Sequence, residues 1–326
     1  MTSERSGELS SPVDYEIRPM RRTDYAGYWQ ITRLAIGPFE RSTGLDGSAE
    51  PAIAQLSHRS VWLILNLARF FRRPLVEIAL ATRGGEVVGT ATVLWLPRAG
   101  YVQGVATSPE MRGRGIASRI LAYHAEQARR FHRAWLALDV ESENETATRV
   151  YRNAGYRETG RFTWFTRSDL PPNGIAPVPP TVLPIGSADW KGLSARLDAS
   201  RPHDYREAFP AGKRVLNHNE YLVRSGPTEV QSWKRELPGG SVAALRACFV
   251  TGVRQAVYLP MSTDPNDGPE VFLGLIDAAT EWFRSRGPAR VLAVASEPRG
   301  GASAALEQRG FAPVASTIAM IAPLSK

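Results

Sequence analysis

The sequence predicts two copies of one mixed α/β fold, joined in tandem. The first indication is length, since 326 residues are about twice the usual domain size of roughly 100 to 200 residues. The second is an internal repeat: placing Gly84 on Gly239 aligns the two halves at an offset of 155 residues (239 minus 84). The third is the proline-rich stretch from Leu170 to Pro180, which favours an extended linker over a helix interior or a central strand.

Hydrophobic periodicity predicts the elements of the first copy in the order βααβββαβαβ. A short strand comes first, and a helix capped near Thr23 or Asp24 follows it. Arg83-Gly-Gly is a turn between two apolar runs and predicts a hairpin. A third strand then leads into an amphipathic helix, and a strand, a helix and a final strand complete the copy. The predicted ranges are 15–19, 24 onward, 52–71, 76–82, 87–96, 101–107, 114–131, 134–140, 144–154 and 157–167.

The repeat continues beyond the hairpin at the same offset. It places the helical pattern 120–126 on 275–281, the strand 136–140 on 291–295, and Gly155 on Gly310. The openings of the two copies, 17–19 and 182–184, align at a different offset, so the first copy carries extra residues before its hairpin. We therefore predict a flexible leader (1–14), a first domain (15–168), a linker (169–181) and a second domain (182–326).

Composition excludes several classes of function. The net charge of +8 would suit nucleic acid, but the arginines are scattered through amphipathic segments and form no long basic run. No apolar stretch is long enough for a membrane span, and the N-terminus lacks a secretion signal, so we expect a cytoplasmic protein. Cys248 is the only cysteine and the histidines lack ligand spacing, so we predict no metal. Whether the protein forms a homodimer stays open.

One segment of the first copy has the features of an anion site. Residues 105–117 join the end of a strand directly to the start of a helix. Glycines there let backbone N–H groups approach a ligand closely, and the first turn of a helix has unpaired N–H groups at the positive end of its dipole. Arg112 and Arg114 add fixed positive charge beside it. This combination suits a diphosphate.

The same segment resembles a known signature. Arg112-Gly113-Arg114-Gly115-Ile116-Ala117 is similar to the R/Q-x-x-G-x-G/A motif of GNAT acetyltransferases, which follows a strand as it does here. The stretch from Leu138 to Tyr156 resembles the second motif of that family, L-x-V-x-x-x-N-x-x-A-x-x-x-Y-x-x-x-G-F/Y, at the expected distance downstream. The resemblance covers residues 15–167.

The resemblance implies a fold, a cofactor and site residues. Each copy would be a mostly antiparallel sheet flanked by helices, and acetyl-CoA would lie between two splayed strands of the first copy. Tyr151 would act as the general acid that protonates the departing thiolate, a role that is worth about a hundred- to ten-thousandfold in rate. The coenzyme-binding residues that the resemblance implies are Val105, Ala106, Thr107, Arg112, Gly113, Arg114, Gly115, Ile116, Ala117, Ser118 and Asn144.

The sequence departs from the family in two places. Family members often carry a Glu in the strand before Val105, where it takes a proton from the amine, but this chain has Tyr101-Val-Gln103-Gly104 there. Asp139 and Glu141 are nearby in sequence without a fixed role, so we name no base. In the second copy, the offset of 155 maps four coenzyme or catalytic positions onto residues without that chemistry, which predicts a degenerate domain. The pairs are Arg112 and Asp267, Gly115 and Glu270, Asn144 and Arg299, and Tyr151 and Leu306.

Three hypotheses for the function follow. The first is transfer of an acetyl group from acetyl-CoA to a primary amine of a small molecule, by direct attack in a ternary complex. It expects a closed acceptor pocket built from about residues 36–73. The second is N-acetylation of a protein or peptide, which expects an open or acidic groove. The third is a non-catalytic acyl-CoA sensor, which the missing Glu favours and the intact Tyr151 disfavours.

Overall fold

The computed structural model describes residues 15–43, 54, 58–70, 74–168, 177–199, 203–209, 228–250, 255–264, 266–284, 286–287, 290–297 and 300–324. The predicted leader and residues 169–176 of the predicted linker lie outside this set. In the first copy the strands are β1 (Glu16–Pro19), β2 (Val76–Arg83), β3 (Glu86–Trp95), β4 (Ala99–Thr107), β5 (Trp135–Glu141) and β6 (Arg157–Arg167). Its helices are η1 (Arg22–Asp24), α1 (Tyr25–Thr43), α3 (Arg59–Phe70), η3 (Pro109–Met111), α4 (Ile116–Arg130) and α5 (Glu145–Asn153).

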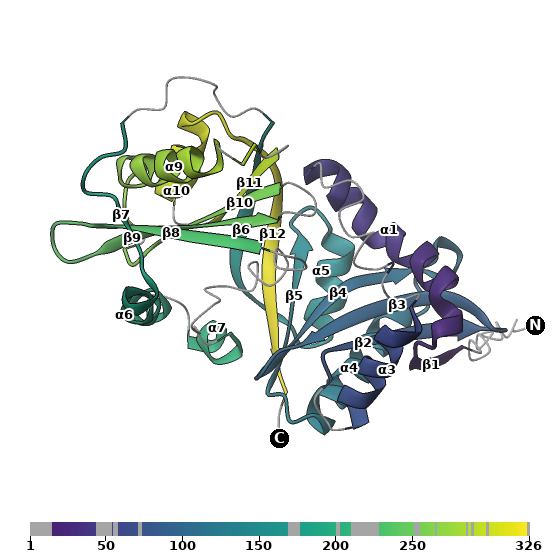
Figure 1. Cartoon of the computed structure of the whole chain (residues 1–326). Coiled ribbons are helices and arrows are strands. Elements are labelled where there is room, and N and C mark those ends of the chain that lie inside the picture. Colours follow the sequence, from purple (N-terminus) through teal and green to yellow (C-terminus); the bar gives the residue numbers. More distant parts are fainter. Residues whose placement is uncertain are drawn as a thin grey trace, which may run out of the picture.

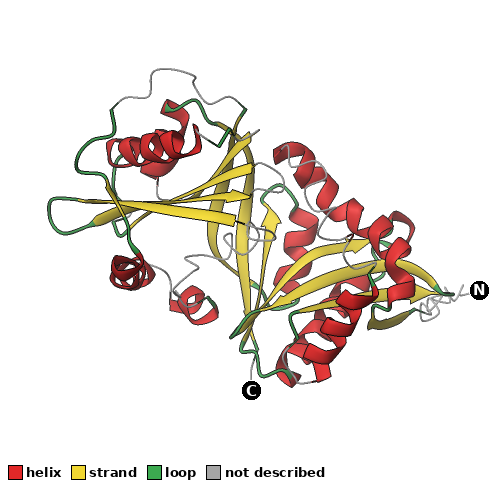
Figure 2. Cartoon of the chain, in the orientation of Figure 1, coloured by secondary structure: helices red, strands yellow, loops and turns green. Residues whose placement is uncertain are grey.

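The second copy repeats this plan. Its strands are β7 (Leu183–Pro184), β8 (Thr228–Glu236), β9 (Val242–Val250), β10 (Gln255–Ser262), β11 (Arg290–Glu297) and β12 (Ala312–Pro323). Its helices are α6 (Ser187–Ala199), α7 (His203–Ala208), α9 (Pro269–Arg284) and α10 (Gly300–Gln308). The element order and ranges predicted for the first copy agree with the structure to within a few residues, apart from the middle helical region, where the described helix spans α3 only. The predicted mixed, mostly antiparallel α/β fold is confirmed (Figures 1 and 2).

All the described strands belong to one twelve-stranded sheet. Their order is β1-β2-β3-β4-β5-β12-β6-β11-β10-β9-β8-β7. The pairs β4–β5 and β10–β11 are parallel and the other pairs are antiparallel. Each copy therefore contributes one parallel pair at the corresponding place, as the repeat predicts.

The two copies exchange their last strands, which the sequence did not reveal. β12 of the second copy pairs with β5, and β6 of the first copy pairs with β11. The two exchanged strands also pair with each other in the middle of the sheet. A chain ending at residue 168 would leave β5 without β12, one of its two neighbours, and β6 without both of its neighbours, which exposes unpaired backbone groups. The predicted division at the linker stays a proposal about the two evolutionary units, because one continuous sheet contains the strands of both copies.

The two faces of the sheet around β4 and β5 carry different helices. Alternate residues of the strands, including Val102, Leu138 and Val140, pack with α4 and α5 in one core cluster. The residues between them, including Tyr101 and Ala137, pack on the opposite face against Tyr205 of α7. α1 also lies on this second face, because Tyr28 and Ile31 pack with Ala106 of β4. We call these the α4 face and the α1 face.

His124 of α4 makes the stability of this core dependent on pH. The side chain is fully buried, its Nε2 donates to the carbonyl oxygen of Ala91 at 3.2 Å, and its Nδ1 has no partner among the described residues. Burial lowers the pKa of His124 from 6.5 to about 4. A lowered pKa means that the stabilisation is complete above about pH 6.5 and is lost as the pH falls towards 4.

We therefore expect the wild type to lose about 3 kcal/mol more of its unfolding free energy between pH 7 and pH 4 than His124→Gln does. Glutamine keeps a donor for the Ala91 carbonyl but does not titrate. Urea midpoints of both proteins at the two pH values measure the difference. Equal losses in the two proteins would show that the imidazole does not have this lowered pKa.

Candidate functional site

The strands β4 and β5 pair over three positions and then separate. Their parallel register runs from Ala99 opposite Trp135 to Tyr101 opposite Ala137 and ends there. Beyond this point β4 pairs only with β3, and β5 pairs only with β12. The register of β3 and β4 shifts at Gly104, whose φ of +63° is a conformation that suits glycine. Residues 102–107 of β4 have no partner on β5, so the backbone groups on that side are not paired within the sheet. We call the place where the two strands separate the opening.

The helix α4 begins at the far end of β4 with its N-terminus uncapped. Gly115 is the N-cap residue with φ +76°, and no side chain accepts a hydrogen bond from the first turn. The first turn contains no acidic residue. Arg112 is tied back to β4, since its Nε donates to the carbonyl oxygen of Thr107 at 3.5 Å. The segment 112–118 thus presents free N–H groups, a helix dipole and two exposed arginines at the end of the opening.

The shape of this segment also fits an anion. A Cβ built on Gly113 or Gly115 would meet no atom within 4 Å, so the space beside the backbone is open. Ile116 is buried and anchors the helix, whereas Arg114 and Ser118 are exposed. The residues that the sequence assigned to the diphosphate therefore lie together around one open helix N-terminus.

Tyr151 lies on the α4 face, in the core cluster beside the opening. It is 8% exposed, its ring centroid lies 6.0 Å from that of Tyr156, and its hydroxyl has no hydrogen-bond partner among the described residues. Burial raises the pKa of Tyr151 to about 12, so the hydroxyl is protonated at neutral pH and can donate. Asn144 is the N-cap of α5, where its Oδ1 accepts from the N–H of Ala147 at 3.0 Å. Its predicted contact with the coenzyme stays a prediction.

The corresponding place in the second copy is filled. A Cβ on Gly301 of α10 would collide with the carbonyl oxygen of Asp267 and with Gly268, because the loop before α9 lies directly against α10. The carboxylate of Glu270 folds over Gly268 at the start of α9. Leu306, which takes the place of Tyr151, is fully buried. Arg299, the counterpart of Asn144, lies outside the described residues.

Helix α7 of the second copy packs on one part of the α1 face of the first, around Tyr101. Tyr205, Ala208 and Phe209 pack on Tyr101 and its neighbours, and Arg98 forms an ion pair with Glu207 at 2.6 Å. The polar residues His203-Asp-Tyr205 form the first turn of helix α7.

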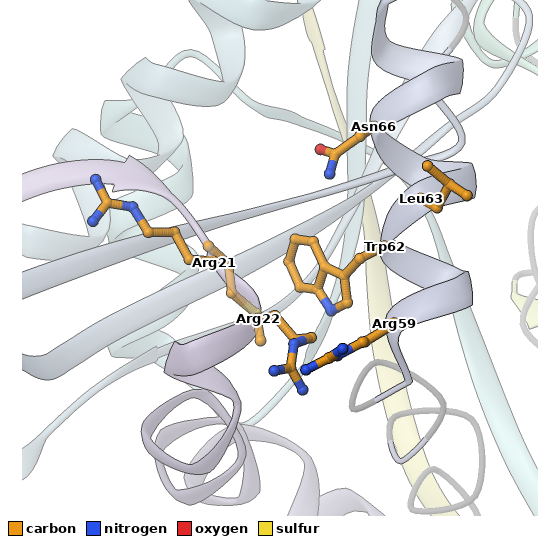
Figure 3. A pocket seen from close by; sticks show the side chains of 7 residues that line it. Arg21, Arg22, Arg59, Trp62, Leu63 and Asn66 are labelled. Carbon is orange, nitrogen blue, oxygen red and sulfur yellow. The ribbon is translucent and has the colours of Figure 1, made fainter.

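Three arginines line a hollow on the α1 face, between the β1–α1 connection and α3. The arginine-lined hollow comprises Met20, Arg21, Arg22, Arg59, Trp62, Leu63 and Asn66. Figure 3 shows Arg22 and Arg59 converging beside the indole of Trp62, while Arg21 extends away. No lining residue is acidic, and the neighbouring Asp24 is already bound by Arg18 at 2.6 Å. Trp62 and Met20 join the core cluster of Tyr28 and Ala106, which places the hollow on the α1 face.

Among the described residues, no group of three or more His, Cys, Asp and Glu side chains is arranged to hold a metal ion. None of the described helices is both long and apolar enough to span a bilayer.

Comparison with known sequences points to one family. The model of the acetyltransferase (GNAT) family matches residues 48–156. An acetyltransferase of Agrobacterium fabrum, Atu2258, is 31% identical over 128 residues, which cover 37% of this chain and 85% of that protein. Aminoalkylphosphonate N-acetyltransferase of Salmonella typhimurium is 33% identical over 100 residues, which cover 28% of this chain and 63% of that protein.

A solved structure resembles both copies together. A tandem GNAT protein from the clavulanic acid biosynthesis pathway superposes with a TM-score of 0.56 at 16% identity, and the match covers 96% of this chain and 99% of that one. At this identity the likeness shows the fold alone.

Proposed function

We propose, from the premise that this chain belongs to the GNAT acetyltransferase family, that it transfers an acetyl group from acetyl-CoA to a primary amine of a small molecule by direct attack in a ternary complex. The observation that carries the proposal is the uncapped N-terminus of α4 at the end of the opening between β4 and β5. Tyr151 beside that opening supplies a protonated hydroxyl.

Each part of the opening has a proposed role. The N–H groups and arginines of residues 112–118 bind the diphosphate of acetyl-CoA, where each charge-assisted hydrogen bond contributes roughly 1.5 to 3 kcal/mol. Backbone groups of Val105, Ala106 and Thr107 bind the pantetheine arm, because this part of β4 has no partner on β5. Tyr151 donates its proton to the departing thiolate. We propose that only the first copy binds coenzyme, since carboxylates and a closed loop stand at the second position.

We further propose that the acceptor carries an anionic group beside its amine. Arg22 and Arg59 have no ion-pair partner among the described residues, and they converge on the face where α1 lies. Paired guanidinium groups suit phosphonate, phosphate or carboxylate oxygens. The name of the Salmonella typhimurium relative gives an aminoalkylphosphonate as its substrate, which is an amine of this class.

Thiol release from acetyl-CoA tests both proposals. We expect turnover with 2-aminoethylphosphonate and a higher KM for ethanolamine, which replaces the phosphonate by a neutral hydroxyl. Arg22→Ala and Arg59→Ala should each raise the KM for 2-aminoethylphosphonate by about tenfold or more, as expected for the loss of one charge-assisted contact, and should leave that for ethanolamine unchanged.

Arg33→Ala is the matched control, since Arg33 is an exposed arginine of α1 that stacks on Trp29 outside the hollow. Equal effects of the three substitutions on KM would show that the arginine-lined hollow does not bind the acceptor. Tight binding of acetyl-CoA without thiol release from any amine would contradict the enzyme proposal and favour a sensor.

A further inference from the structure

Asp139 lies at the point where β4 and β5 begin to separate. The last paired residues are Tyr101 and Ala137, so Asp139 is the next residue of β5 on the same face, and Gln103 is its counterpart across the opening. On β12 the partner of Asp139 is Ala319, a small residue that adds no second charge. The carboxylate is partly exposed.

Asp139 and Tyr151 lie on opposite faces of the sheet. Residues 138 and 140 pack with Tyr151 on the α4 face, whereas Ala137 packs with Tyr101 on the α1 face. Because side chains alternate along a strand, Asp139 belongs to the α1 face. Both faces border the place where the strands separate, since Tyr151 packs in one cluster with Leu138 and Val140, the two neighbours of Asp139 on β5. A thioester lying in the opening would therefore have a proton donor on one face and a carboxylate on the other.

Tyr101 holds Asp139 in place. Its hydroxyl donates to Oδ2 of Asp139 at 2.9 Å, across the start of the opening. Tyr101 is 4% exposed, and burial, followed by the charge of Asp139, holds its pKa well above the ordinary value of about 10. The tyrosine is thus a fixed donor at neutral pH, and its hydrogen bond orients the carboxylate at the start of the opening.

We infer that Asp139, positioned by Tyr101, binds the ammonium group of the acceptor on the α1 face and removes its proton before attack. The inference rests on the proposed function. Strand β4 contains no carboxylate, since glutamine and glycine occupy positions 103 and 104. The inference therefore assigns the base to the neighbouring strand β5.

The protons balance as follows. An acceptor ammonium gives one proton to Asp139, which passes it to solvent because the carboxylate is partly exposed. The neutral amine attacks the thioester carbonyl, a C–N bond forms, and the C–S bond breaks with its electron pair going to sulfur. The thiolate takes a proton from Tyr151, and the proton lost by the nitrogen as it becomes an amide restores that hydroxyl. The net result is an amide, free CoA thiol and one proton in solution.

Glu141 is the competing carboxylate and the matched control. It lies on the same face of β5 two residues further from the point of separation, opposite Thr317 of β12. Its pKa is raised by burial and by Glu143, and its side chain has no hydrogen-bond partner among the described residues. A base at Glu141 would require the reacting amine to lie near the wide end of the opening, away from Tyr101.

The experiment compares a strongly basic with a weakly basic nucleophile. Thiol release would be measured with 2-aminoethylphosphonate and with hydroxylamine, which is largely unprotonated at pH 7.5, for wild type, Asp139→Asn, Tyr101→Phe and Glu141→Gln. We expect Asp139→Asn to lower kcat about a hundredfold or more with the basic amine and less than about tenfold with hydroxylamine. Tyr101→Phe should show the same selectivity with a smaller loss, and Glu141→Gln should match wild type with both.

Calorimetric titration of acetyl-CoA separates this inference from the proposed function. Asp139→Asn and Tyr101→Phe should bind acetyl-CoA as wild type does, because neither residue belongs to the segment 112–118. Equal losses with both nucleophiles, or a selective loss in Glu141→Gln alone, would overturn the role of Asp139 and leave the proposed function standing. A wild type that binds acetyl-CoA but releases no thiol with either nucleophile would overturn both.

Discussion

Gly115→Glu is expected to abolish the binding of acetyl-CoA. The substitution places a carboxylate at the uncapped N-terminus of α4, where the proposed diphosphate would lie, and it copies Glu270 of the second copy. It also forces a side chain into a φ of +76°, which disfavours residues other than glycine. Loss of two charge-assisted hydrogen bonds alone corresponds to roughly a hundred- to ten-thousandfold in affinity. Calorimetric titration should show one equivalent in wild type and none in the variant.

Gly115→Asn separates the charge from the backbone conformation. Asparagine tolerates positive φ better than other residues with a side chain and carries no charge. We expect this variant to bind acetyl-CoA with an affinity within about tenfold of wild type. The only cost left is the backbone strain of a side chain at positive φ, which is roughly 1 kcal/mol. Two equivalents bound by wild type, or full binding by Gly115→Glu, would mean that the coenzyme occupies another place in the sheet.

Tyr151→Phe is expected to lower kcat by about a hundred- to ten-thousandfold while the affinity for acetyl-CoA stays the same. The ring still fills the core cluster on the α4 face, but the proton for the thiolate is gone. Burial raises the pKa of Tyr151 to about 12, so its protonated form persists below that pH. In the wild type, kcat should therefore show no loss from this group between pH 7 and pH 10. Steady-state thiol release over that range measures both effects.

Tyr156→Phe is the matched control for this experiment. Tyr156 lies beside Tyr151 in the same cluster, and its buried hydroxyl has no partner among the described residues. Removing that hydroxyl should leave kcat within about threefold of wild type, since an unpaired buried polar group contributes nothing favourable. Similar losses in both variants would indicate that packing, and not proton donation, explains the effect at Tyr151.

The segment that forms the proposed coenzyme site could be predicted because its structure is local. Residues 105–118 run without interruption from the end of β4 to the first turn of α4, so their order alone places glycines, arginines and free N–H groups together. Tyr151 and Asn144 belong to one short helix and its cap, where spacing again decides the arrangement. The same reasoning predicted that the second copy lacks the site, since glutamate and leucine stand at its key positions.

The acceptor side could not be predicted, because it depends on contacts between residues far apart in the chain. Tyr101 and Asp139 are in separate strands, and only the register of β4 and β5 brings the hydroxyl to the carboxylate. Arg22 and Arg59 come from different helices, and their convergence depends on how α3 packs beside the β1–α1 connection. The predicted acceptor pocket, residues 36–73, includes α3 but not Arg21 and Arg22, which line the hollow from the other side.

The sequence by itself determined the family, the duplication, the elements of the first copy and the copy that keeps the coenzyme motif. Each of these depends on local hydrophobic pattern and on the spacing of residues along the chain. Only the tertiary structure decided that β6 and β12 change places and that α7 covers Tyr101. The physical reason is that the two copies carry strands of the same pattern at equivalent positions. Hydrophobic alternation allows either strand to pair with β5, and the choice between them is made by packing across the whole sheet.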